Sequence, residues 1–270
     1  KNLTSTLIHL YLDWNYLTTD KFSVPFAPKL KRISLNHNQF TEFPDFRSMP
    51  QIRIISMVYN SLTSIPEEIM VELMNLKQLF LSGNKIAPEH IPDVAGTLEY
   101  INLANNHISD MPKWETLGKA LKNLTLSVST ISAVTDEDLD NLPALTELHV
   151  AEGMITKFPH LPRNGPRMQI LDFTNNRIKE VTAMQLEPLQ NASTILCDSN
   201  EIVTIPNLCF VNFVPKFELS LKKNALVCDK RLAGAMKASA MIQSYTLAMD
   251  ECEYSDLTGA VSRFSNQASY

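Results

Sequence analysis

The sequence predicts an α/β solenoid, in which short coils stack and each adds one strand to a curved, parallel sheet on the concave side. The convex side should be irregular, with 3-10 turns or short helices. Two observations predict this fold. A pattern of spaced apolar residues that ends in Asn and one more apolar residue recurs at steps of 22 to 24 residues. The chain also has only 7 Gly in 270 residues, which argues against a fold with glycine-rich nucleotide-binding loops.

The pattern is clearest in Leu76–Ile86, which reads LKQLFLSGNKI. Good copies include Leu7–Leu17 (LIHLYLDWNYL) and Met168–Ile178 (MQILDFTNNRI), and the weakest copy is Lys216–Leu226. Ten copies in register fill residues 1–226. Because one copy cannot bury its own apolar face, neighbouring copies must stack against one another.

The Asn of the pattern is interpreted as structural. Each turn after a strand leaves buried backbone groups without a strand partner, and each such group costs about 1–3 kcal/mol. An Asn side chain can donate to one group and accept from another. The Asn column consists of Asn15, Asn38, Asn60, Asn84, Asn106, Asn176, Asn200 and Asn224. Ser129 and Gly153 stand in the column in the sixth and seventh copies, where we expect local irregularity.

This repeat resembles that of the leucine-rich-repeat superfamily over nearly the whole chain. The step length and the C-terminal text look most like extracellular animal members, such as Toll-like receptor ectodomains, insect immune proteins and matrix or adhesion proteins. The resemblance implies a binding function in innate recognition or cell adhesion. The chain begins within the pattern, so we expect it to be a processed or trimmed piece.

Residues 227–270 are expected to form a C-terminal cap. They resemble the cysteine-bearing cap of extracellular family members, although the second cysteine pair and the Trp of that cap are missing. The matching residues, which begin just before this stretch, are Asn224, Leu226, Cys228, Asp229, Cys252, Leu257 and Gly259. The resemblance implies a disulfide between Cys228 and Cys252, and the alternative is two free thiols in an intracellular protein. Cys197, at an inward strand position, is interpreted as a small buried hydrophobe.

Three N-glycosylation sequons occur, at Asn2, Asn123 and Asn191. They favour an extracellular location. Asn123 falls on the predicted concave face in the sixth copy, where a glycan would obstruct the middle of the sheet. Either the ligand binds elsewhere or Asn123 is unmodified.

The concave face of the first five repeats is the predicted binding surface. Side chains alternate along a strand, so residues between the inward apolar positions are available for recognition. Exposed Trp, Tyr and Arg are the residue types enriched at interface hot spots. The alternative is that the aromatic side chains only pack against their cross-strand neighbours. The candidate residues are Tyr11, Asp13, Trp14, Arg32, His37, Tyr59, Phe80, Tyr100 and Asn102, with Lys31, Arg53 and Lys77 alongside.

Other functional classes find little support. Net charge is −5 and no basic run occurs, so no nucleic-acid partner is predicted. No apolar stretch is long enough to cross a bilayer. Glu147, His149 and Asp172 could meet on the concave face, but no nucleophile matches them and the face is open. No metal ligand set and no cofactor are predicted.

We therefore predict a non-catalytic, extracellular recognition module for a protein or glycan ligand, with homo- or heterodimerisation left open. The alternative is an intracellular scaffold or regulatory subunit. A third class, less favoured by the residues, is a hydrolase or metal enzyme built on the same solenoid.

Overall fold

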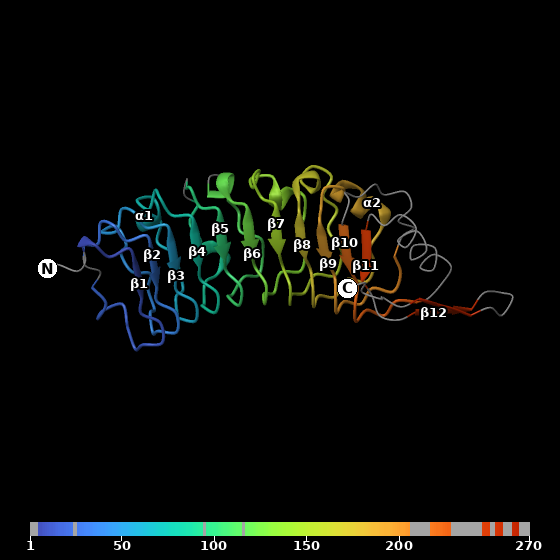
Figure 1. The fold of residues 1–270 in the computed structure, drawn as a ribbon, viewed down its shortest axis with the longest axis horizontal. Helices are drawn as coiled ribbons and strands as arrows, with labels where there is room; N and C mark the ends of the chain where they lie inside the picture. Colours follow the sequence, from blue (N-terminus) through green and yellow to red (C-terminus); the bar gives the residue numbers. More distant parts are fainter. Residues whose placement is uncertain are drawn as a thin grey trace. The chain divides into compact units, whose positions relative to one another are not determined.

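The computed structural model describes residues 5–23, 26–93, 96–114, 117–205, 217–227, 245–248, 252–255 and 261–264. The chain divides into two compact units. The first consists of residues 1–130 and 138–145, and the second of residues 131–137 and 146–270. Each unit is a stack of similar coils, as the repeated sequence predicts (Figure 1).

The first unit contains a sheet of three-residue strands that pair in chain order, each parallel to the next. The pairing register matches equivalent residues of successive repeats, as Leu79 with Ile101 shows. Such short strands are stable only because every coil brings its own apolar face to its neighbours. The strands are β1 (His9–Tyr11), β2 (Arg32–Ser34), β3 (Ile54–Ser56), β4 (Gln78–Phe80), β5 (Tyr100–Asn102) and β6 (Asn123–Thr125).

The second unit repeats this arrangement. Its strands β7 (Glu147–His149), β8 (Ile170–Asp172), β9 (Thr194–Leu196), β10 (Phe217–Ser220) and β11 (Tyr245–Ala248) are parallel and pair in chain order. A separate antiparallel pair joins β12 (Cys252–Ser255) and β13 (Val261–Phe264). Strands β11 to β13 fall within residues 227–270, the stretch for which a cap was predicted.

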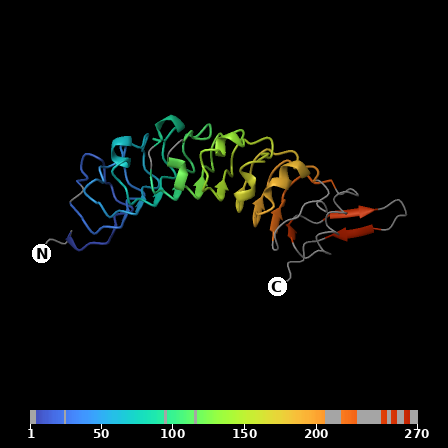
Figure 2. The same ribbon diagram turned by 90° about the horizontal axis from the view of Figure 1, so that it is seen from above.

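Short helical segments lie on the side of each coil opposite its strand (Figure 2). They are α1 (Glu67–Met70), η2 (Pro88–His90), η3 (Leu117–Ala120), η4 (Glu137–Leu139), η5 (Gly165–Arg167), α2 (Ala183–Leu186) and η6 (Glu187–Leu189). Their Pro and Gly content and their length explain why 3-10 turns predominate. Within the described ranges, none of them is both long and apolar enough to span a bilayer.

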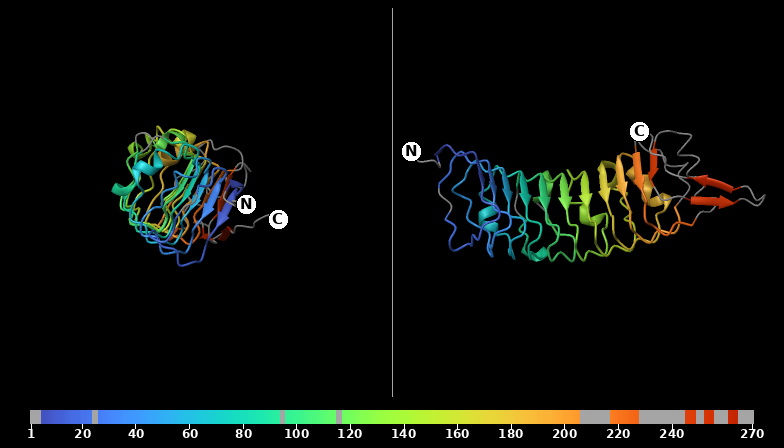
Figure 3. Two further views of the ribbon diagram at one scale, coloured as in Figure 1. Left: turned by 90° about the vertical axis from the view of Figure 1, so that its left-hand side faces the viewer. Right: turned by 60° about the horizontal axis from the view of Figure 1, so that its bottom comes forward.

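The core lies between the strands and these helical segments. In the clearest repeat, Leu79, Leu81 and Ile86 are fully buried, while Gln78 and Phe80 on either side of Leu79 are half-buried on the outer surface. In strands β4 to β9 the middle residue is buried and its two neighbours are half-buried, as the period-two alternation of a strand requires. Figure 3 shows the strands of each unit side by side.

The Asn column is structural, as predicted. The Nδ2 atom of Asn84 donates to the carbonyl oxygens of Met57 in the preceding repeat and Leu81 in its own repeat, both at 2.9 Å. Its Oδ1 atom accepts from the backbone N of Leu62 at 2.9 Å. Asn176 makes the same three contacts in the second unit. Each amide thus ties its own turn to the preceding coil.

Three positions in the column differ from this scheme, and one of them, Gly153, has no side chain to form these bonds. Asn15 is exposed and donates only to carbonyls of its own turn. Ser129 replaces the amide with a hydroxyl that is buried and makes no hydrogen bond to any described residue. The boundary between the two units, after Thr130, falls between Ser129 and Gly153.

The irregularity that we expected around Ser129 and Gly153 is absent from the described backbone. Strands β6 and β7 keep their three-residue length, and the residue before each column position keeps a left-handed conformation, with φ of 57° at Val128 and 55° at Glu152. The effect of the substitutions is therefore local and lies in the side-chain hydrogen bonds.

Candidate functional site

The outward side of β1–β5, here called the sheet face, carries five of the predicted binding residues on its strands: Tyr11, Arg32, Phe80, Tyr100 and Asn102. The guanidinium of Arg32 lies 5.7 Å from the centre of the Tyr11 ring, within range of a cation–π contact. The Phe80 and Tyr100 rings lie 4.9 Å apart between centroids. Neighbouring strands bring these rings together, so they form two packed pairs rather than isolated side chains.

Trp14, His37 and Tyr59 lie beyond the strand ends, in the turns after β1, β2 and β3, and not on the strands where the alternation had placed them. Each has a left-handed backbone, with φ between 53° and 57°. Trp14 stacks on His37 with centroids 3.6 Å apart and an interplanar angle of 7°, and His37 is 4.7 Å from Tyr59. These three rings, which we call the aromatic edge, are equivalent residues of successive repeats.

The aromatic edge ends at Gly83, the equivalent residue of the fourth repeat. Gly83 has φ of 70°, and a Cβ atom there would lie 2.4 Å from Cδ1 of Tyr59. The absence of a side chain leaves space for the Tyr59 ring to lie over the turn. Trp14 remains 76% exposed and Tyr59 52% exposed, so the edge presents a large apolar surface to solvent.

Asp13 belongs to a hydrogen-bonded chain on the same face, which the sequence analysis did not foresee. Its Oδ1 atom accepts from Ser34 Oγ at 2.6 Å and from the backbone N of Asn36 at 2.7 Å. Asn36 in turn accepts through Oδ1 from Ser56 Oγ at 2.7 Å. Ser34 and Ser56 are buried. Asp13 therefore links the first two repeats. The sequence pattern alone did not predict these hydrogen bonds, because they join residues of different repeats.

Positive side chains line the starting end of the strands. Lys31, Arg53 and Lys77 are the residues immediately before β2, β3 and β4, and we call them the basic row. Backbone hydrogen bonds from Arg53 N to Lys31 O (2.9 Å) and from Lys77 N to Arg53 O (2.8 Å) confirm that they are direct neighbours. The sequence analysis noted these residues but could not show that they adjoin.

Glu99 ends the basic row in the fifth repeat. It forms ion pairs of 2.8 Å with both Lys77 and Lys122. Hydrogen bonds from Lys122 and Lys77 lower the pKa of the Glu99 carboxyl to about 2. Because Glu99 is ionised at all ordinary pH values, it neutralises part of the positive charge at this end and leaves Lys31 and Arg53 as the exposed cations of the row.

The second unit brings His149 and Asp172 together, as the sequence analysis considered. The Nδ1 atom of His149 is 3.7 Å from Oδ2 of Asp172. Burial raises the pKa of the Asp172 carboxyl, but hydrogen bonds from His149 and Thr174 outweigh it and hold the pKa below its usual value. The carboxylate is thus held by neighbouring donors. Among the described residues, no three His, Cys, Asp or Glu side chains gather in a way that could hold a metal ion.

One hollow in the first unit lies away from the sheet face. It has a volume of about 780 Å³, and its lining includes Phe22, Phe43, Asp45 and Ile69. Asp45 is paired with Arg47 at 2.6 Å. None of the predicted binding residues lines this hollow.

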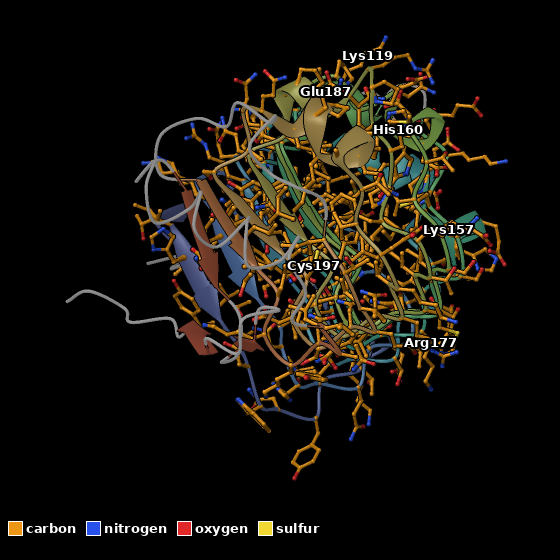
Figure 4. The ribbon with its side chains drawn as sticks, turned by 90° about the vertical axis from the view of Figure 1, so that its right-hand side faces the viewer. Lys119, Lys157, His160, Arg177, Glu187 and Cys197 are labelled. Atoms are coloured by element: carbon orange, nitrogen blue, oxygen red, sulfur yellow. The ribbon has the colours of Figure 1, made fainter. Side chains whose placement is uncertain are left out.

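The predicted modification sites are described in part. Asn123 lies half-buried on β6, and Asn191 is exposed after η6, where its Nδ2 atom donates to Pro166 O at 2.7 Å. Asn2 and Cys228 lie outside the described residues, so the Cys228–Cys252 bridge stays a prediction. Cys197 is fully buried as predicted, and Figure 4 shows it inside the coil. Burial raises the pKa of its thiol.

Comparison with known proteins places the fold in a family. Residues 28–86 match the family model described as "Leucine rich repeat". Mouse podocan is 28% identical over 84% of this chain and 38% of its own length. The rat leucine-rich repeat-containing G-protein coupled receptor 5 is 28% identical over 56% of this chain and 16% of its own length. The chain thus aligns with less than half the length of either relative.

A solved structure has the same fold. The matching chain comes from an octameric complex of Latrophilin 3, Unc5D and the leucine-rich-repeat protein FLRT2. The match has a TM-score of 0.69 at 18% identity and covers 91% of this chain and 84% of that one. At this identity the likeness concerns the fold alone. The repeated sequence, the stacked coils and the family-model match show that the chain is built from leucine-rich repeats and is similar to members of the leucine-rich-repeat superfamily.

Proposed function

We propose that the chain is a non-catalytic recognition module that binds a protein partner through the sheet face of β1–β5 and the aromatic edge that follows these strands. The aromatic edge of Trp14, His37 and Tyr59 is the observation that carries this proposal. It is exposed, apolar and continuous across three repeats. Domains that remain alone in solution seldom expose a surface of this kind.

The order of the aromatic edge also favours binding. The rings are stacked on one another and held by turns whose backbone is fixed by the Asn column, so little conformational freedom remains to be lost when a partner docks. Arg32 over Tyr11 and the Phe80–Tyr100 pair extend the same surface along the strands. Aromatic and Arg side chains that are already positioned are typical of interface hot spots.

The proposal is tested with peptides selected on the intact protein from a phage-displayed random library. The triple variant Trp14→Ala, Tyr59→Ala, Phe80→Ala should weaken the selected peptides at least about tenfold and leave the melting temperature nearly unchanged. The matched control is Val71→Ala, Met74→Ala, Met184→Ala, which removes exposed apolar side chains at or near α1 and α2, away from the strands. Equal binding by both triple variants, or selection of peptides that bind only the control surface, would show that the sheet face is the wrong site.

The proposed location is extracellular, with a role in innate recognition or cell adhesion. It is supported by the cap residues Cys228 and Cys252, by the exposed sequon at Asn191, and by a relative that is named a receptor. Protein purified from a secreting animal cell should lose mass on treatment with a glycosidase and gain thiols on reduction. Four free thiols and no attached sugar would favour the intracellular alternative instead.

A further inference from the structure

The positive side chains of the basic row repel one another in the free protein. Lys31, Arg53 and Lys77 precede adjacent strands, and parallel strands lie about 4.8 Å apart, so like charges stand side by side. Like charges directly opposite one another in a sheet are destabilising. Lys77 is relieved by Glu99, but within the described residues no ion pair is formed by Lys31 or Arg53. Such conflicts are expected at functional positions.

Arg32 adds a second cation to the same corner of the sheet. Its guanidinium rests over the Tyr11 ring, and its Nε atom is buried without a hydrogen bond to any described residue. A guanidinium that is already oriented by an aromatic ring is well suited to receive a carboxylate through two parallel hydrogen bonds. The oriented guanidinium therefore favours the same kind of ligand as the repulsion within the basic row.

We propose that the partner docks an acidic protein segment on this corner, with its carboxylates against Lys31, Arg32 and Arg53 and its apolar side chains on the aromatic edge. This proposal rests on the proposed function and specifies the partner's chemistry. Charge complementarity is the argument for the occupant. The row is short, since two strand steps cover about 10 Å, and Glu99 closes it. That length matches a few carboxylates of a protein segment.

The test compares variants of the intact chain that differ only in where charge is changed. The row variant carries Lys31→Glu and Arg53→Glu, which reverse the charge of two exposed side chains. A second, neutral variant carries Lys31→Gln and Arg53→Gln, which remove that charge. The matched control reverses Lys119 and Lys157, which are also exposed and project away from the strands (Figure 4). The row variant and its control therefore have the same net charge.

The probes are short poly-L-glutamate and a heparin fragment, titrated at low and high ionic strength. We expect poly-L-glutamate to bind the unaltered chain and the control equally, and the row variant about tenfold more weakly, with the difference shrinking as salt screens the charges. The neutral Gln variant should bind weakly as well, while its stability equals or exceeds that of the unaltered chain because the repulsion is gone. Lysine and arginine side chains without a binding role would not combine weaker binding of poly-L-glutamate with equal or higher stability on neutralisation.

The contrary outcomes are distinct. Failure of poly-L-glutamate to bind, or equal loss in the row variant and the control, would overturn the proposal. Binding of the heparin fragment alone would also overturn it, in favour of a sulfated glycan. If library peptides still depend on the aromatic edge in either case, the proposed function stands and only the partner's chemistry is wrong. If charge matters but the aromatic edge does not, the proposed function fails instead.

Discussion

Replacement of Asn84 by Ala is expected to lower the free energy of unfolding by about 3 kcal/mol, because three buried backbone groups lose their partner at once. These groups are the carbonyls of Met57 and Leu81 and the N–H of Leu62. Asn84 is only 6% exposed, so water cannot easily replace the amide. The measurement is urea unfolding followed by circular dichroism.

The control for this prediction is built into the column. Asn15 is the same residue type in the same turn, but it is exposed and bonds only to Leu12 and Asp13 of its own repeat. Asn15→Ala should therefore cost less than about 1 kcal/mol. If the two variants lost the same stability, the amides would matter for the local turn alone and not for holding one coil to the next.

The second large effect is expected at Asp136 in the second unit. Its Oδ2 atom accepts from the backbone N and the Nε of Arg163, at 3.0 and 2.9 Å. Its Oδ1 atom accepts from the backbone N and the Nδ2 of Asn164, at 3.1 and 2.8 Å. The Nδ2 of Asn164 also donates to the backbone oxygen of Asp136 at 2.6 Å, and this bond survives in Asp136→Ala. The substitution removes the acceptor of the buried backbone N of Asn164 and the charged partner of Arg163, and we expect a loss of about 3 kcal/mol in urea unfolding at neutral pH.

The same carboxylate should make stability depend on pH. Burial raises the pKa of Asp136, but the hydrogen bonds from Arg163 and Asn164 outweigh it, and the net pKa is lowered in the folded state. The folded protein then binds fewer protons than the unfolded chain, so the contribution is complete above the unfolded pKa of about 3.9 and is lost as pH falls below it. Unfolding midpoints measured below about pH 4 should converge for the unaltered chain and Asp136→Ala.

Asp45 provides the comparison for Asp136. It also has a lowered pKa and an ion pair of 2.6 Å with Arg47, yet both side chains are about half exposed. Solvent screens such a pair, so Asp45→Ala should change stability by less than about 1 kcal/mol at any pH. A loss at Asp45 as large as that at Asp136 would mean that burial does not determine the strength of these carboxylate contacts.

The sequence was sufficient for the fold because the same physical requirement recurs in every repeat. Leu79, Leu81 and Asn84 could be assigned to the core and the turn since equivalent residues appear at a constant step. The strand alternation, however, was extended too far. Trp14, His37 and Tyr59 follow the strands, and their direction is set by a left-handed turn that no period-two pattern describes.

Contacts between repeats were harder to foresee than contacts within one. Asp13 accepts hydrogen bonds from Ser34 and Asn36, which are more than 20 positions away in the sequence. Nothing in the sequence distinguishes these two residues from ordinary polar surface residues. Lys31 and Arg53 adjoin only across strands, so a search for charge runs along the chain does not find them. The sequence likewise did not indicate that Gly83 lacks a side chain where the Tyr59 ring of the preceding repeat lies over the turn.

The fully buried thiol of Cys197 can report local opening of the fold. A group that is fully buried and whose pKa is raised cannot react with an alkylating reagent until the ninth coil opens. The rate at which Cys197 is alkylated can be followed by peptide mass. It would therefore report how often the structure around β9 opens locally, without an engineered probe.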